Sequence, residues 1–357
     1  MLLRHLLLLL AALPICSGIA EGQAKTSGRA ASKPAPALQD LVLQGKIPQA
    51  VRVASKSATQ AEDAVRKLLD LVDLQVTERQ IAKAQATLQA TETFVNACAK
   101  SGAAKTLPTD PIKGRKLRLQ GIQLNDDKQF EKAEVILRQA LDICKQIKDA
   151  RLEGGVHNNL GIALQFQEKL EEASKEFESA RQIAESQKDS LRAGSYNFNL
   201  GKALYQLGRH EQALQAFRRS AEQNKAASRT EMEARATMMS GMAQSKFDII
   251  NPEALKYFEQ ALKLFEQLGD KRNAGWVYYL MGDHVAYNQK FADAAAYGEK
   301  AVPLLAAAND TAGLIPCYEF LSDMYARTGV KEKSEHFKKL AEDLSRKTPE
   351  PKGSRKN

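Results

Sequence analysis

The side chains best suited to catalysis or metal binding in this sequence are five histidines, four cysteines and many carboxylates. His210 and Glu211 begin the pattern H-E-x-x-H, in which two histidines one helical turn apart bind zinc. Leu214 occupies the position of the second histidine, so the metal pair is missing. No GxSxG, GxGxxG or Walker motif occurs either. We therefore predict a protein that is not an enzyme and holds neither a cofactor nor a metal ion.

The cysteines do not form a recognisable framework. Cys98, Cys144 and Cys317 are separated by 46 and 173 residues, which matches neither a CxxC pair nor a zinc site. We expect them to be small apolar residues packed between helices.

The first 20 residues have the layout of a secretory signal peptide. Arg4 supplies the positive charge, an apolar run follows, and small residues precede Glu21. The run is too short to span a membrane, so no stable insertion is expected after cleavage. A lipid anchor at Cys16 is the weaker alternative, because the bulky Ile15 stands where a small residue is expected. These features predict an exported protein, periplasmic or secreted.

The chain carries a net charge of +9, much of it at its C-terminal end. Residues 346–357 contain five basic side chains against Glu350, with two prolines and no large apolar group. Such a segment is typical of a solvated, disordered tail. No nucleic-acid partner is predicted, but binding of this tail to an anionic polymer or a membrane surface remains an alternative function.

A period of forty residues organises the middle of the chain. Small residues recur at intervals of 40 or 41, and each is followed 12 or 13 positions later by a second small residue. The first series is Gly121, Gly161, Gly201, Gly241, Gly282 and Ser322, and the second is Ala133, Ala173, Ala213, Ala254, Ala294 and Ser334. A large apolar residue follows in four units, at Leu137, Phe177, Phe217 and Phe258. Two helices approach closely only where small residues face each other, so this pattern predicts antiparallel helix pairs.

These six units resemble the tetratricopeptide repeat, in the lengthened form with about forty residues per unit. The resemblance implies an all-α, right-handed superhelical solenoid, with six repeats over residues 112–345. Upstream we expect a flexible leader (21–36), degenerate helical repeats (37–100) and a helix-breaking linker (101–111). His157, Asn197 and Thr237 replace the large apolar residue usual in the family, which predicts looser packing in those units.

The resemblance also implies a concave groove lined by the first helix of each unit. The side chains expected to bind a partner there are Arg115, Arg118, Asn158, Asn159, Phe166, Phe198, Asn199, Lys202, Tyr205, Arg235, Lys246, Trp276, Tyr279, Asp283 and Tyr287. The earlier part of this wall is rich in basic residues, whereas Asp283, Glu319 and Asp323 make its end acidic. The competing interpretation places the aromatic residues in the core.

These observations together favour an exported, non-catalytic scaffold that binds a protein or peptide in its groove. Recognition of a free chain terminus is not expected, because Ile122 stands where the carboxylate clamp of related repeats needs asparagine. A regulatory or carrier module of an unrecognised hydrolase is the remaining alternative.

Overall fold

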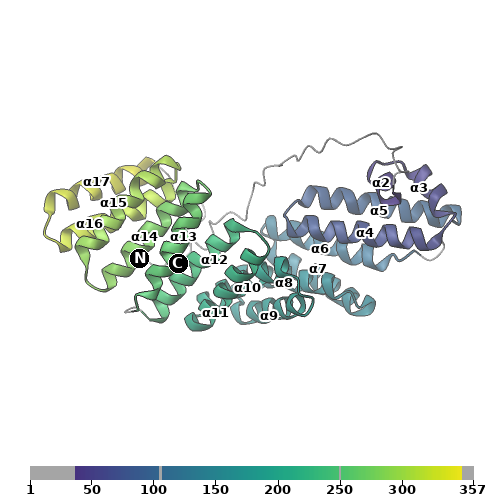
Figure 1. The fold of residues 1–357 in the computed structure, drawn as a ribbon, viewed down its shortest axis with the longest axis horizontal. Coiled ribbons are helices and arrows are strands. Elements are labelled where there is room, and N and C mark those ends of the chain that lie inside the picture. The colour runs from purple at the N-terminus through teal and green to yellow at the C-terminus, as the bar shows by residue number, and fades with distance from the viewer. Residues whose placement is uncertain (1–36, 104–106, 249–250, 348–357) are drawn as a thin grey trace, which may run out of the picture. The chain divides into compact units, whose positions relative to one another are not determined.

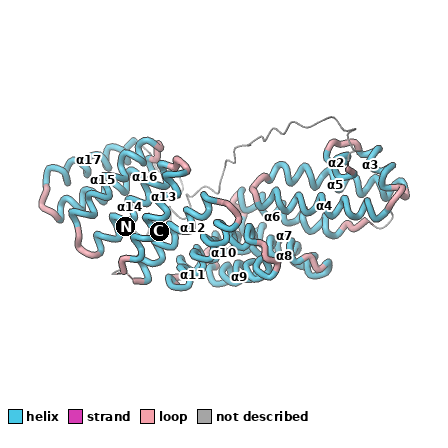
Figure 2. Tube along the Cα trace, in the orientation of Figure 1, coloured by secondary structure: helices cyan, strands magenta, loops and turns pink. Residues whose placement is uncertain are grey.

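A computed structural model describes residues 37–103, 107–248 and 251–347. Within these ranges the secondary structure is helical and contains no strand (Figure 2). The helices are labelled in Figure 1 and are α2 (Leu38–Leu43), α3 (Ile47–Ala54), α4 (Ala58–Thr77), α5 (Ile81–Ser101), α6 (Asp110–Asp126), α7 (Phe130–Ile147), α8 (Ala150–Phe166), α9 (Leu170–Ser186), α10 (Ser190–Gln206), α11 (His210–Ala226), α12 (Thr230–Phe247), α13 (Glu253–Gln267), α14 (Lys271–Tyr287), α15 (Phe291–Ala307), α16 (Thr311–Arg327) and α17 (Lys331–Lys347). The expected all-α array of helix pairs is therefore confirmed.

The helices belong to two compact units that divide after Ala184, near the end of α9. The first unit holds α2 to α9, and the second unit holds α10 to α17.

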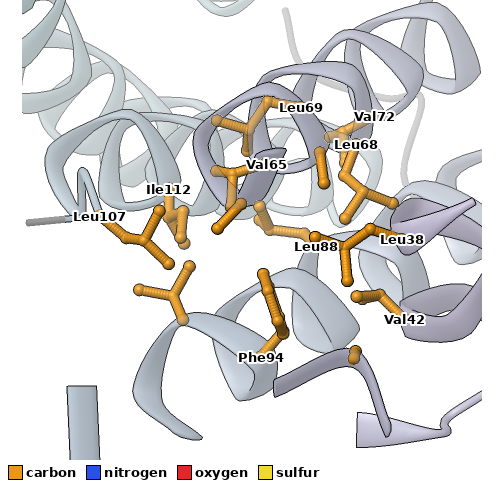
Figure 3. Packing of buried hydrophobic residues seen from close by; sticks show 14 of the residues in the cluster. Leu38, Val42, Val65, Leu68, Leu69, Val72, Leu88, Phe94, Leu107 and Ile112 are labelled. Carbon is orange, nitrogen blue, oxygen red and sulfur yellow. The ribbon is translucent and has the colours of Figure 1, made fainter. Parts of the chain in front are cut away.

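The first unit begins with the short pair α2 and α3 and the long pair α4 and α5. Gly45 adopts a positive φ of 71° in the turn of the short pair, a conformation that glycine adopts without steric cost. Leu68, Leu88 and Phe94 belong to one buried cluster between these helices (Figure 3). The cluster continues to Ile112 and Leu119 of α6, so the degenerate region shares a core with the first full repeat.

The six expected repeats are the pairs α6/α7, α8/α9, α10/α11, α12/α13, α14/α15 and α16/α17. In four of them the first helix begins after an aspartate whose carboxylate accepts the backbone N–H three residues later. These N-caps are Asp149, Asp189, Asp270 and Asp310. Such a cap satisfies one of the unpaired N–H groups at a helix start and contributes about 1 kcal/mol.

The small residues of the repeat meet the large ones, as the pattern predicts. A Cβ on Gly161 would stand 2.7 Å from the ring of Phe177, and a Cβ on Gly241 would stand 2.6 Å from the ring of Phe258. No real Cβ tolerates such distances, so the glycines permit the close packing of the two helices. In the sixth repeat, Ser322 and Ser334 instead exchange hydrogen bonds, each hydroxyl donating to the carbonyl of the other residue over 2.9 Å.

The three polar replacements in the repeat are accommodated by hydrogen bonds. His157 Nδ1 lies 2.6 Å from the Glu176 carboxylate, and the buried Asn197 amide donates to Gln223 over 2.8 Å. The Thr237 hydroxyl donates to the Glu233 carbonyl one turn earlier. Polar contacts thus replace the apolar packing that is usual at this position.

The boundaries of the linker and the tail differ slightly from those expected. Ser101 still belongs to α5, which ends at the left-handed Gly102, and Asp110 and Pro111 already belong to α6. At the other end, α17 continues to Lys347. The expected signal peptide, leader, Cys16 and residues 348–357 lie outside the described residues. In the part that is described, no helix has both the length and the apolar character needed to cross a membrane.

Cys98, Cys144 and Cys317 are buried and unpaired, as expected of packing residues. Burial raises the pKa of Cys144 and of Cys317 to about 12. Because the thiolate is the reactive form, these thiols are chemically quiet in the folded protein.

Candidate binding surface

The first helices of successive repeats contact one another within each unit. In the first unit α6 contacts α8, and in the second unit α10, α12, α14 and α16 contact one another in sequence. We refer to these four helices as the first-helix layer of the second unit. The residues predicted to bind a partner lie on α6 and α8 in the first unit and on this layer in the second.

Arg115 and Arg118, two predicted binding residues on α6, are buried with 4% of each side chain exposed. Both bind Asp73 of α4, which is fully buried: Arg115 Nη2 lies 2.6 Å from one carboxylate oxygen, and Arg118 Nη1 lies 3.2 Å from the other. Arg115 also reaches the carboxylate of Asp149 at 3.0 Å. The two charges are therefore neutralised inside the protein, and this region offers less free positive charge than the sequence suggests.

The same network extends to Asn159 on α8. Arg118 Nε donates to its side-chain oxygen over 3.1 Å, and the Asn125 amide donates to its backbone carbonyl over 3.0 Å. Gly155 makes room for the guanidinium, because a Cβ there would stand 2.4 Å from Arg118 Cζ. Asn158 beside it is half-buried. Asn159 thus accepts hydrogen bonds from two side chains of its own unit, one through its amide oxygen and one through its backbone carbonyl.

Phe166, at the end of α8, is the exposed member of the predicted set in the first unit, with 54% of its surface accessible. Its ring stacks on Phe130 of α7, with centroids 4.7 Å apart. One face of Phe166 is therefore covered by the same unit.

In the second unit, the predicted residues of α10 and α12 are mostly buried or half-buried. Phe198 packs its edge against Phe217, whereas Asn199 and Lys202 remain half-buried. Arg235 on α12 is 4% exposed, and its Nε lies 3.7 Å from Glu231 one turn earlier. These residues contribute more to packing than the groove prediction assumes.

Trp276 on α14 is also largely buried, at 7% exposure. Its indole N–H donates to Asp310 over 2.8 Å, and Asp310 also accepts from Arg272 and caps α16. The Trp276 ring meets Tyr279 edge-on at 5.6 Å. Truncation of Trp276 would therefore open a cavity, which agrees with the competing interpretation that places the aromatic residues in the core.

Tyr205, Lys246, Asp283 and Tyr287 come together on the first-helix layer from α10, α12 and α14. Lys246 Nζ donates to the Tyr287 hydroxyl over 2.9 Å and lies 4.6 Å from the centre of that ring. Tyr287 is 44% exposed. Burial raises the pKa of the half-buried Asp283, and the charge of Lys246 opposes that shift. The nearby charge of Asp283 adds to the burial that raises the pKa of Tyr205. This group brings a carboxylate, phenol hydroxyls and aromatic rings together on one layer of helices.

Asp73 and Asp310, which accept from the predicted residues Arg115, Arg118 and Trp276, were not identified from the sequence. The sequence contains a signal for Asp310, because Asp149, Asp189, Asp270 and Asp310 recur with the same forty-residue period as the glycines. The sequence contains no such signal for Asp73, since this residue lies outside the aligned repeats.

The described residues contain no group of three or more His, Cys, Asp or Glu side chains placed to hold a metal ion. The nearest approach to a nucleophile and base pair among the contacts seen is Ser245, whose hydroxyl oxygen lies 3.0 Å from His284 Nδ1. Both residues are buried, at 8% and 2% exposure, and burial lowers the pKa of His284. This pair joins α12 to α14 and has little access to a substrate.

The sequence profile of the tetratricopeptide repeat matches residues 114–186, 152–226 and 234–307, which together make up just over half of the chain. The chain belongs to the tetratricopeptide-repeat family. No curated protein matches its sequence significantly.

Several solved tetratricopeptide-repeat structures share the fold. A signal-transduction ATPase with numerous domains and a tetratricopeptide-repeat sensor, from Pyrococcus horikoshii, matches with a TM-score of 0.62 and 14% identity. That match covers 87% of this chain but 47% of the ATPase, so this chain spans about half of the length of that relative. The apo form of RapI matches with a TM-score of 0.52 and 14% identity over 79% of this chain and 98% of RapI. NprR in complex with its cognate peptide NprX matches with a TM-score of 0.51 and 14% identity over 80% of each chain.

Proposed function

We propose that this chain is an exported, non-catalytic scaffold that binds a protein or peptide partner on the first-helix layer of its second unit. The observation that carries this proposal is the convergence of Tyr205, Lys246, Asp283 and Tyr287 from three neighbouring helices. Aromatic rings beside polar groups are typical of surfaces that bind peptides and proteins.

The fold supports the same function. The structure of NprR, which has this fold, contains its cognate peptide NprX. Stacked helix pairs give an extended surface on which successive repeats can contact successive residues of a partner. Export is supported by the layout of residues 1–20 alone.

Capture of partners from the native host, using the purified chain and two matched variants, tests the binding proposal. We expect Tyr287→Ala to weaken the captured partner's affinity by about tenfold or more, as at other aromatic hot spots. Tyr297→Ala, which truncates an aromatic residue on the second helix of the same repeat, is the control and should bind normally. A partner that binds Tyr287→Ala normally but is lost at high salt and on deletion of residues 346–357 would show that the basic tail is the binding element instead.

N-terminal sequencing of the protein from its native host tests export. We expect the mature chain to begin near Glu21, or near Lys25 if cleavage follows Ala24. A soluble cytoplasmic product that retains Met1 would refute export, and a lipid on Cys16 would replace the cleaved form with an anchored one.

A further inference from the structure

Asp283 is the one member of the proposed surface whose charge is left without a partner in the described part of the chain. Its carboxylate is half-buried and forms no hydrogen bond or ion pair with any described residue. An ionised carboxylate that has lost water without gaining a partner destabilises the folded state. A ligand group of opposite charge would remove that penalty.

Two tyrosine hydroxyls near Asp283 are also available to a ligand. Tyr205 and Tyr279 are 8% and 5% exposed, and within the described ranges neither hydroxyl has a hydrogen-bond partner. The rings are buried, but neither hydroxyl oxygen is fully enclosed, so each can reach solvent or a ligand. Burial and then the charge of Asp283 raise the pKa of both hydroxyls, and Tyr279 lies one helical turn before Asp283 on α14.

The surrounding rings are held in place. Tyr279 lies edge-on between Trp276 and Phe320, with centroids 5.6 and 5.4 Å away. Lys246 fixes Tyr287 through a hydrogen bond and through its position over the ring. Tyr279, Asp283 and Tyr287 are four residues apart along α14 and therefore share one face of the helix.

A carboxylate on the neighbouring helix α16 has a charge of the same sign as Asp283. Glu319 of α16 is exposed, makes no hydrogen bond or ion pair within the described part of the chain, and adds to the shift at Tyr279. Lys246 is the one cation that acts on Asp283, and its ammonium already donates to Tyr287. The local environment thus favours an incoming positive group.

We propose that Asp283, Tyr205 and Tyr279 bind a basic side chain of a peptide partner, a guanidinium or an ammonium group. This inference rests on the proposed function and adds the chemistry of the ligand to it. The basic group donates hydrogen bonds to the Asp283 carboxylate and to the phenol oxygens, and its cation lies against the tyrosine rings.

The test begins with selection from a displayed library of random linear peptides on the full chain without residues 1–20. We expect the binders to share an arginine or a lysine at one position, and we expect this preference to disappear when the selection is repeated on Asp283→Asn. Asp293→Asn, which removes an exposed carboxylate from α15 of the same repeat, is the matched control and should keep the preference.

The second step tests the charge of the basic peptide side chain separately from its length. One selected peptide is made with its arginine replaced by citrulline, or its lysine by acetyllysine, which keeps the length and removes the charge. The neutral peptide should bind the unmodified protein about tenfold or more weakly, because a charge-assisted hydrogen bond is lost. Asp283→Asn should bind the two peptides with affinities within about twofold of each other, as expected when the interacting partner is missing.

The tyrosine hydroxyls are tested by Tyr205→Phe and Tyr279→Phe, which keep the packed rings. Each should weaken the basic peptide by a few-fold relative to Tyr278→Phe, a control on the same helix as Tyr279 but on another face. Equal affinities of all three variants would remove the hydroxyls from the proposed site.

The remaining outcomes separate this inference from the proposed function. Peptides that bind without a basic residue and depend on Tyr287 would overturn the inference and leave the function intact. A folded protein that selects no peptide at all would overturn both. Arginine amide or spermidine could also bind as tightly as the peptide and lose this affinity in Asp283→Asn. That result would show that the bound cation is a small molecule and not a peptide side chain.

Discussion

Gly201 of α10 lies directly against the ring of Phe217 of α11, so that a Cβ on the glycine would stand 2.7 Å from ring atom Cδ1. The same relationship joins Gly121 to Leu137 two repeats earlier, Gly161 to Phe177 one repeat earlier and Gly241 to Phe258 one repeat later. The glycine is thus required by packing, since its own φ is negative and any residue could adopt it.

We predict that Gly201→Ala destabilises the protein by about 1–3 kcal/mol, because the added methyl group overpacks the helix interface. The higher helix propensity of alanine opposes this change by about 1 kcal/mol. Urea unfolding of Gly201→Ala, Phe217→Leu and the double variant gives the measurement. Phe217→Leu should rescue part of the loss in the double variant, and simple additivity would show that the two residues do not compete for the same space.

Asp73→Asn should cost about 3–5 kcal/mol of unfolding free energy, because it leaves Arg115 and Arg118 buried without their shared anion. Asp70→Asn is the control on the same helix, since Asp70 is exposed and lies 3.4 Å from Arg151. An exposed pair contributes roughly 0–1 kcal/mol. Chemical denaturation of both variants decides the matter, and equal midpoints would mean that the buried network contributes little.

Asp310→Ala should destabilise the fifth and sixth repeats by about 2–4 kcal/mol, because it removes a helix cap and leaves the Trp276 indole N–H unpaired. Trp276 is the only tryptophan of the chain, so its fluorescence reports this site. We expect a shift of the native emission to longer wavelength. Asp189→Ala removes the equivalent cap of α10 and should leave the native emission unchanged.

Asp283→Asn should raise the stability of the unliganded protein at neutral pH, by about 0.5–2 kcal/mol, because it removes a desolvated charge that has no partner in the part of the chain that the structure describes. Burial raises the pKa of the Asp283 carboxyl, so the folded state keeps its proton to a higher pH than the unfolded chain does. The contribution of Asp283 to stability is therefore greatest below the ordinary aspartate pKa and falls as the pH rises through the folded pKa.

The gain in melting temperature from Asp283→Asn should accordingly shrink as the pH is lowered through that window. Lys246, Glu319 and the tyrosines around Asp283 are present in both proteins, so their titration affects both alike. A constant difference in melting temperature across the acidic range would mean that the pKa of Asp283 is the same in the folded protein and in the unfolded chain.

The sequence by itself determined the helix pairs, their register and the facing of Gly201 by Phe217. These features depend on residue size repeated with a forty-residue period, and local periodicity along the chain is enough to reveal them. The aspartate caps carry the same period and were also readable in principle.

The tertiary structure decided which of the predicted binding residues are engaged and which are available. Asp73 reaches Arg115 and Arg118 across 42 and 45 residues, and Asp310 reaches Trp276 across 34 residues. Asp283, in contrast, has no such partner among the described residues. The physical reason is that neutralisation and desolvation depend on which helices pack together in space, and the repeat pattern specifies the size of the interface residues but not the charge of their neighbours.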